Sequence, residues 1–180
     1  MNNEAKAVAR LIDYYGTNDV MKILQAKCAK VTARNYKKQR GWSHYCLNNF
    51  YVDYMAGLDE YSEREVLGHE LGHIIRHASL LKKLGEIGLK QEDPLFDYKT
   101  PTELEANRFA AYFLIDPKEL EELLREGRQL TECAKILHVH VPFAMLIAQD
   151  MQRDGIIPSH CNLYVPPRFM RDLEIDIDEY

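Results

Sequence analysis

The sequence predicts an α+β fold, in which a strand segment is followed by two helices and then by a helical C-terminal part. Residues 43–55 are rich in Tyr, Phe and Val, which favour strands. Residues 63–81 and 100–114 carry apolar side chains at helical spacing. A chain of 180 residues with 46% hydrophobic content is long enough to bury one core. We therefore expect a single domain over residues 1–180.

The first 40 residues are expected to be a helical scaffold. Two short amphipathic helices before residue 33 are separated at Gly16, and Thr17, Asn18 and Asp19 offer a new N-cap. Seven basic residues then lie close together in the sequence: Lys22, Lys27, Lys30, Arg34, Lys37, Lys38 and Arg40. Such a stretch could meet an acidic partner or DNA, but it is more often a solvated face.

Residues 43–55 give the clearest strand signal. Asn48 and Asn49 interrupt this segment and indicate a hairpin turn or a bulge. Residues 50–54 are a candidate for the edge strand of the sheet. A free sheet edge can bind an extended peptide by strand addition.

The most informative stretch is HExxH, spelled by His69, Glu70, Leu71, Gly72 and His73. On a helix, two histidines four residues apart share one face and can both bind zinc, while the Glu beside the first can act on a water molecule. This arrangement predicts a zinc hydrolase, in which Glu70 is the general base.

Local signals place the HExxH motif on a helix that begins near Glu63. Ser62 is a good N-cap with Glu65 as its capping-box partner, and Tyr61 and Val66 occupy the hydrophobic-staple positions. Gly68 and Gly72 are four residues apart and form a flat stripe where another backbone can approach. We interpret this stripe as a packing surface.

A catalytic zinc needs a third protein ligand and an open position for water. Glu103 can supply this ligand from a second helix, which begins with Pro101 at or near its first position. Asn107 follows one turn later and is placed to hydrogen-bond a metal ligand. Small residues on the same face, Ala110 and Ala111, would let this helix lie close to the HExxH helix.

Two registers are open for the start of this second helix. If Thr100 is the N-cap, Glu103 completes a capping box and its carboxylate is occupied by the helix start. If Thr102 is the N-cap, Glu105 becomes the box partner and Glu103 is released for the metal. We favour the second register because HExxH and the segment from Glu103 to Ala110 occur together in this chain.

The two motifs resemble those of the ImmA/IrrE metallopeptidases, whose signature is HExxH followed by ExxA[ND]xFA. Glu103, Ala106, Asn107, Phe109 and Ala110 match the second half, and the resemblance extends from about residue 40 to residue 115. It implies a small zincin-like fold, in which a small mixed sheet packs on the HExxH helix and on the second zinc-ligand helix. The implied zinc ligands are His69, His73 and Glu103. The resemblance also implies a protease that cuts a helix-turn-helix repressor and so switches on genes of a mobile element or a stress operon.

His77 lies one turn after His73 on the predicted site face. It is a candidate substrate contact, or else the end of a polar stripe at the mouth of the site. The group that stabilises the oxyanion cannot be chosen from the sequence among the candidates His77, Tyr98, Tyr112, His138 and His140.

The rest of the chain is expected to hold a crossover and further helices. Residues 82–99 read as a loop. Asp116, Pro117 and Glu119 start a helix that should end at Gly127, and Thr131 and Pro142 start two more. Accordingly, residues 41–127 are the predicted zinc-binding core, 128–155 a degenerate helix-turn-helix and 156–180 an acidic tail.

The helix-turn-helix departs from a DNA-reading unit. His138 stands where the turn usually has glycine, and the second helix has no Arg or Lys before Arg153. A net charge of −5 likewise gives no electrostatic case for nucleic acid binding, so we expect a protein partner. A binding module that sequesters a repressor without cutting it is the main alternative, and a transcription factor that uses these helices is a third hypothesis.

The sequence also bears on compartment and redox state. We find no signal peptide near Met1 and no apolar run of membrane-spanning length, so we expect a cytoplasmic protein. The four cysteines contain no CxxC pair and are expected to be reduced thiols: Cys28, Cys46, Cys133 and Cys161. The cleaved bond, the activating signal and the oligomeric state are left open.

Overall fold

A computed structural model describes residues 3–37, 39–87, 100–158 and 163. The chain divides into two compact units, residues 1–114 and 115–180, and each is described by itself. The first unit combines a three-stranded mixed sheet with helices, so the α+β prediction is confirmed. The expected single domain over residues 1–180 stays a prediction.

The N-terminal helices agree with the sequence. α1 spans Asn3–Tyr15 and α2 spans Val20–Lys27, with Gly16 between them at a φ of 63°. Asp19 is the N-cap of α2, and its side chain accepts a hydrogen bond from the backbone N–H of Lys22 at 3.1 Å.

The sheet has the strand order β1-β3-β2. β1 (Lys30–Arg34) pairs parallel with β3 (Asn49–Met55), and β2 (Gly41–Cys46) pairs antiparallel with β3. Leu47 and Asn48 join β2 to β3 with φ values of 49° and 62°. Positive φ at both central residues is typical of a two-residue type I′ hairpin turn. The predicted hairpin is confirmed, but its turn lies one residue earlier than expected, since Asn49 is already the first residue of β3.

Two expectations about the sheet were wrong. Residues 30–34 form a strand and are not part of a helical scaffold. This segment contains Val31 and Thr32, which favour strands, but we had considered it only as part of the basic stretch. Residues 50–54 belong to the central strand β3, so the edge strands are β1 and β2. Lys38 of the basic stretch lies outside the described residues.

The helix that carries HExxH, α3, spans Glu60–Arg76. Its N-cap is Asp59 and not Ser62, one turn earlier than expected. The carboxylate of Asp59 accepts the backbone N–H groups of Tyr61 and Ser62 at 3.0 Å each, and the Ser62 hydroxyl at 2.7 Å. A carboxylate satisfies more helix N–H groups than a hydroxyl, which explains the earlier start.

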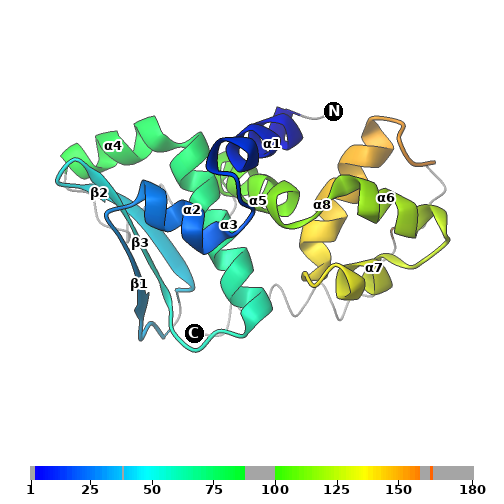
Figure 1. Ribbon diagram of the computed structural model, residues 1–180, viewed down its shortest axis with the longest axis horizontal. Helices are drawn as coiled ribbons and strands as arrows, with labels where there is room; N and C mark the ends of the chain where they lie inside the picture. The colour runs from blue at the N-terminus through cyan, green and yellow to red at the C-terminus, as the bar shows by residue number, and fades with distance from the viewer. Residues whose placement is uncertain (1–2, 38, 88–99, 159–162, 164–180) are drawn as a thin grey trace. The chain divides into compact units, whose positions relative to one another are not determined.

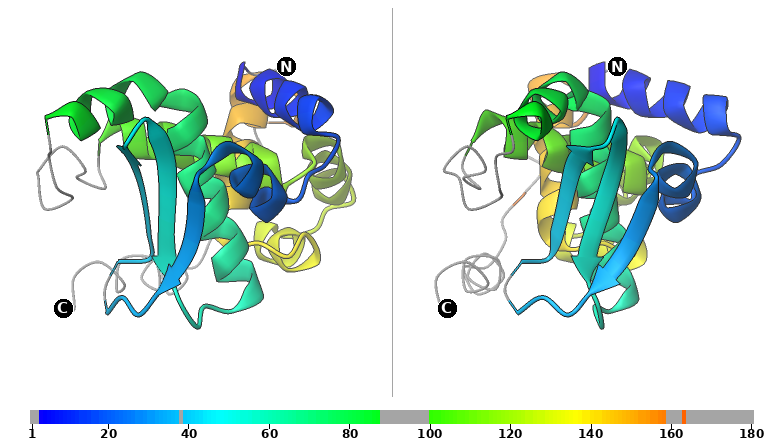
Figure 2. Two further views of the ribbon diagram at one scale, coloured as in Figure 1. Left: turned by 60° about the vertical axis from the view of Figure 1, so that its left-hand side comes forward. Right: turned by 90° about the vertical axis from the view of Figure 1, so that its left-hand side faces the viewer.

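α3 ends sooner than the apolar periodicity suggested. His77 is both the C-cap of α3 and the N-cap of α4 (Ala78–Glu86). The apolar periodicity therefore extends over two helices that are separated by a break at His77. Residues 82–86, expected in a loop, are the last part of α4, whereas residues 88–99 lie outside the described residues. In the views of Figure 2 the sheet lies on one side of α3, and α4 lies across one end of the sheet, in contact with the edge strand β2.

α5 spans Pro101–Leu114 and packs on the side of α3 away from the sheet. The core of this unit is formed by fully buried side chains of α2, α3, α5 and β3: Ile23, Leu24, Val52, Leu71, Ile74 and Phe109. Both helices that carry the predicted metal ligands are therefore anchored by buried apolar contacts.

The second unit is helical (Figure 1). α6 (Pro117–Arg125) has Asp116 as its N-cap and ends before Gly127 at a φ of 81°, as predicted. α7 (Leu130–Ile136) begins at Gln129 with a capping box, slightly before the predicted Thr131. α8 spans Val141–Arg153, and the residues after position 163 lie outside the description.

α7 and α8 form the expected turn between two short helices, with His138 at a φ of 55° where glycine is usual. Within the described residues no single helix is long and apolar enough to cross a membrane. By length and composition α7 and α8 pass that test only as a pair bent by 117°. Of the cysteines, Cys28, Cys46 and Cys133 are free, and Cys161 lies outside the described residues.

Candidate metal centre

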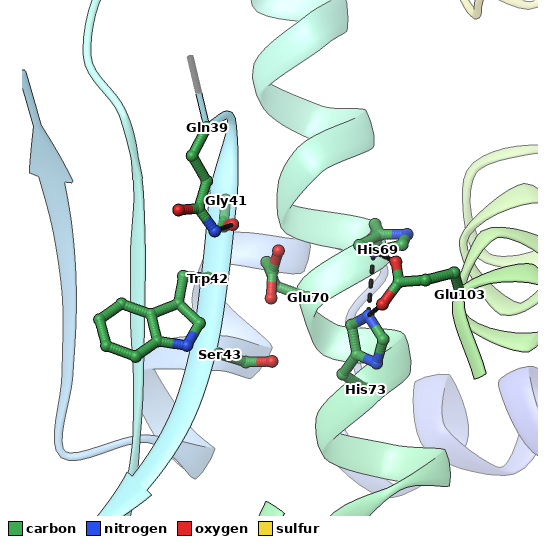
Figure 3. Close-up of a pocket in the computed structure, with 8 residues that line it drawn as sticks. All are labelled: Gln39, Gly41, Trp42, Ser43, His69, Glu70, His73 and Glu103. Atoms are coloured by element: carbon green, nitrogen blue, oxygen red, sulfur yellow. Dashed lines mark hydrogen bonds and ion pairs between the residues drawn. The ribbon is translucent and has the colours of Figure 1, made fainter. Parts of the chain in front are cut away.

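α3 presents His69, Glu70 and His73 on the side that faces a pocket (Figure 3). The four-residue spacing places both imidazoles on one side of the helix, with their Nε2 atoms 3.0 Å apart. His69 is partly buried and His73 is 6% exposed. The two rings therefore converge in a largely desolvated place.

α5 brings Glu103 to the same point. Its two carboxylate oxygens lie 3.0 Å from Nε2 of His69 and 3.2 Å from Nε2 of His73. The close approach of the two helices depends on Gly72, because a Cβ there would lie 2.9 Å from the carbonyl oxygen of Ala106. The glycine stripe is thus a packing device that brings the third predicted ligand within reach.

The start of α5 differs in part from the favoured register. The backbone N–H of Glu103 donates to the hydroxyl of Thr100 at 3.4 Å, and the N–H of Leu104 donates to its carbonyl at 3.2 Å, so Thr100 and not Thr102 caps the helix. The carboxylate of Glu103 nevertheless faces the histidines. Capping by Thr100 and an inward Glu103 are compatible because the return bond of a capping box is optional.

These three side chains fit a tetrahedral metal ion. One ligand atom from each lies within 4.8 Å of the others. Zinc–nitrogen and zinc–oxygen bonds of about 2.0–2.2 Å place tetrahedral ligands about 3.3 Å apart, close to the spacings found. Two imidazoles and one carboxylate also leave a fourth position, as a hydrolytic site requires.

The same three side chains also interact electrostatically. Burial raises the pKa of Glu103, but hydrogen bonds from His69 and His73 outweigh it and bring the pKa to about 2. Burial likewise lowers the pKa of His69, yet its hydrogen bond to Glu103 and the charges of Glu70 and Glu103 raise it overall. A concentration of negative charge beside two imidazoles suits a divalent cation.

The outer nitrogens of the two histidines are also engaged. Nδ1 of His69 lies 2.8 Å from Oδ1 of Asn107, the contact expected from the sequence. Nδ1 of His73 lies 3.1 Å from Nδ1 of His77, whose Nε2 lies 3.1 Å from Oε2 of Glu105. His77 is buried and does not line the pocket, so the structure does not place it as the expected substrate contact.

The pocket between α3 and β2 has a volume of about 240 Å³. Besides the predicted residues it is lined by four that sequence analysis missed: Gln39, Gly41, Trp42 and Ser43. Three of them are the first residues of β2, and Gln39 precedes the strand. The only sequence signal for them was Gly41, at the start of the aromatic strand segment. It indicates a pocket residue only once the structure shows that Glu70 faces it.

Glu70 is 4% exposed and lies against Gly41 (Figure 3). A Cβ at position 41 would lie 2.5 Å from Oε1 of Glu70 and 2.7 Å from Cγ1 of Val66. The edge strand therefore approaches α3 as closely as it does because residue 41 has no side chain.

None of the described oxyanion candidates lines this pocket. Tyr112 and His77 are buried in the first unit, and His138 and His140 belong to the second. Tyr98 lies outside the described residues.

Comparison with known proteins agrees with this geometry. A search of curated proteins finds no match for the chain. The profile of the IrrE N-terminal-like domain, Peptidase_M78, matches residues 28–144, which include α3, α5 and the whole pocket lining. The chain thus belongs to the IrrE N-terminal-like family of M78 peptidases, and it is a metallopeptidase whose candidate metal site is His69, His73 and Glu103.

Proposed function

We propose that this protein is a zinc-dependent endopeptidase with a zincin-like active site. The observation that carries the proposal is the convergence of His69, His73 and Glu103 beside a pocket that also contains Glu70. A zinc ion held by these three residues would polarise the scissile carbonyl and lower the pKa of the attacking water to about 7.

Glu70 is the proposed general base. It is next to His69 in sequence, and its buried carboxylate opens to the pocket where a substrate carbonyl would have to lie. It takes the proton of the attacking water and delivers it to the leaving amine. The carboxylate lies so close to Gly41 that a Cβ there would be 2.5 Å from its Oε1, and this close approach of β2 favours one orientation toward the pocket.

The edge strand β2 offers a place for an extended substrate. The carbonyl of Arg40 accepts the backbone N–H of Met55, so the polar groups of the next residue, Gly41, point away from β3. The carbonyl of Gly41 instead accepts Nε2 of Gln39 at 2.8 Å. Gly41 and Ser43 line the pocket, and a substrate strand could pair with their free backbone groups once Gln39 moves aside.

We further propose a helix-turn-helix repressor as the substrate, cut in the cytoplasm to derepress genes of a mobile element or a stress operon. This finer assignment is supported by the resemblance to ImmA/IrrE proteins. Direct DNA binding is not part of the proposal, because α8 carries no Arg or Lys before Arg153 and buries Ala144, Ile147 and Ala148.

The Glu70→Gln variant distinguishes cleavage from sequestration. It keeps shape and polarity but removes the base, so zinc and partner binding should persist while cleavage drops by about 10² to 10⁴-fold. Wild type and variant are each mixed with a candidate helix-turn-helix repressor, with zinc present, and analysed on gels. If neither cuts the repressor and both release it equally from DNA, the protein acts as a binding module and the protease assignment is wrong.

A further inference from the structure

Contacts between side chains lead from His73, at the metal site, through His77 to Glu105. Its Nδ1 lies 3.1 Å from Nδ1 of His77, and Nε2 of His77 lies 3.1 Å from Oε2 of Glu105. The side chains of His73 and His77 are each 8% exposed, whereas Glu105 is 54% exposed. This series of contacts therefore begins at the buried metal site and ends at a solvent-exposed carboxylate.

The fold fixes the position of His77. It is the residue at which α3 ends and α4 begins, and its backbone is bonded in both directions. Its N–H donates to the carbonyl of His73 at 2.8 Å, and its carbonyl accepts the N–H of Leu81 at 2.9 Å. The break between the helices thus holds the imidazole of His77 against that of His73.

Only one arrangement of protons suits both a metal and these contacts. A neutral imidazole has one N–H and one lone pair. A metal at Nε2 of His73 takes the lone pair, so the proton must be on Nδ1 and needs an acceptor in this buried place. Nδ1 of His77 can accept it only if the proton of His77 is on Nε2, where it points at Glu105.

We propose that His77 and Glu105 are positioning residues for the metal site. Glu105, as an acceptor, selects the Nε2–H form of His77; His77 in turn selects the Nδ1–H form of His73 and fixes the angle of its ring. Asn107 performs the same task directly for His69, through the contact of 2.8 Å between Nδ1 and Oδ1. The inference rests on the proposed metal ligands and adds a function for two residues outside the pocket.

The contact between Glu105 and His77 could instead be an ordinary ion pair that joins α5 to α3. Such a pair would contribute to stability and leave metal affinity alone. Arg34 supplies the control: it pairs with Asp53 at 3.2 Å within the sheet, a contact that involves neither His77 nor Glu105. Arg34→Gln should therefore lower stability without changing zinc affinity.

The test is the zinc dissociation constant of the full chain, measured by competition with a chromophoric chelator. His77→Phe keeps a ring but removes both nitrogens, and Glu105→Leu removes the terminal acceptor; each should weaken zinc binding by about 10 to 100-fold. Glu105→Gln retains an acceptor oxygen and should stay within about threefold of wild type. Circular dichroism verifies that each variant is folded before its affinity is compared.

The outcomes separate this inference from the proposed function. Wild-type zinc affinity in both His77→Phe and Glu105→Leu would overturn the positioning role alone, whereas a wild type that binds no zinc would overturn the metal site itself. If His77→Phe does not fold, nitrogen-15 NMR of the zinc-loaded wild type decides. The proton of His77 should be on Nε2, and a proton on its Nδ1 would contradict the inference.

Discussion

Gly72 and Gly68 lie one turn apart on α3 but have different surroundings. A Cβ at Gly72 would lie 2.9 Å from the carbonyl oxygen and 3.0 Å from Cα of Ala106, whereas one at Gly68 would lie 3.5 Å from Cβ of Ala110. The first is a clash with the backbone of α5, and the second is an ordinary van der Waals contact. We therefore expect Gly72→Ala to push α5 away from α3 and Gly68→Ala to be accommodated.

The magnitude follows from two opposing effects. Replacing glycine by alanine in a helix interior stabilises by about 1 kcal/mol, and this gain is common to both variants. Overpacking costs about 1–3 kcal/mol and applies only at position 72. Gly68→Ala should thus be up to about 1 kcal/mol more stable than wild type, and the two variants should differ by about 1–3 kcal/mol.

Urea unfolding followed by circular dichroism, with metal removed by a chelator, measures this difference. Because α5 carries Glu103 one turn before Ala106, Gly72→Ala should also bind zinc more weakly than Gly68→Ala. Equal unfolding midpoints for the two variants, or a more stable Gly72→Ala, would refute the close approach of the helices at this point.

Three further predictions follow from the site and the thiols. Gly41→Ala should displace the carboxylate of Glu70, since the new Cβ would lie 2.5 Å from its Oε1; cleavage should fall at least about tenfold while zinc stays bound, and loss of zinc would contradict this. Zinc affinity should fall as the pH is lowered from about 8 to 6, because His69 has a raised pKa and must lose its proton before it binds a metal; a pH-independent affinity in competition titrations would disagree. Iodoacetamide should modify exposed Cys46 before buried Cys28, whose pKa is raised by burial to about 11, and peptide mapping by mass spectrometry would expose the reverse order.

The sequence predicted those parts of the site that depend on local spacing. His69 and His73 share a helix face because they are four residues apart, and Asn107 follows Glu103 by one turn for the same reason. The Asn-containing hairpin and the N-cap Asp116 were likewise readable, and the N-cap of α2 was narrowed to Thr17, Asn18 and Asp19, since turn and cap chemistry is local.

Features set by tertiary contact were not readable. Nothing local indicates that β3 lies between β1 and β2, because strand order depends on a parallel pairing across the chain. The start of α3 was misplaced for a different, local reason: two caps compete within one turn, and Asp59 is a stronger acceptor than Ser62, whose hydroxyl donates to it.

The path from His73 to Glu105 was missed because it depends on a tertiary contact between α3 and α5. Periodicity placed His77 on the face of α3 that holds the metal ligands, but the helix ends at this residue and its ring turns to a carboxylate on α5. Glu103 and Glu105 lie about 200° apart around a helix axis, so a single-helix argument allows only one of them near α3. In the structure both carboxylates contact α3, at successive turns: Glu103 contacts His73, and Glu105 contacts His77.

The central claim is that His69, His73 and Glu103 hold one metal ion, and anomalous X-ray diffraction at the zinc edge on crystals of the purified chain tests it most directly. We predict one strong anomalous peak about 2.0–2.2 Å from Nε2 of each histidine and from a carboxylate oxygen of Glu103, with the fourth position open to the pocket. No peak at this point, or a peak enclosed by four protein ligands, would contradict the account.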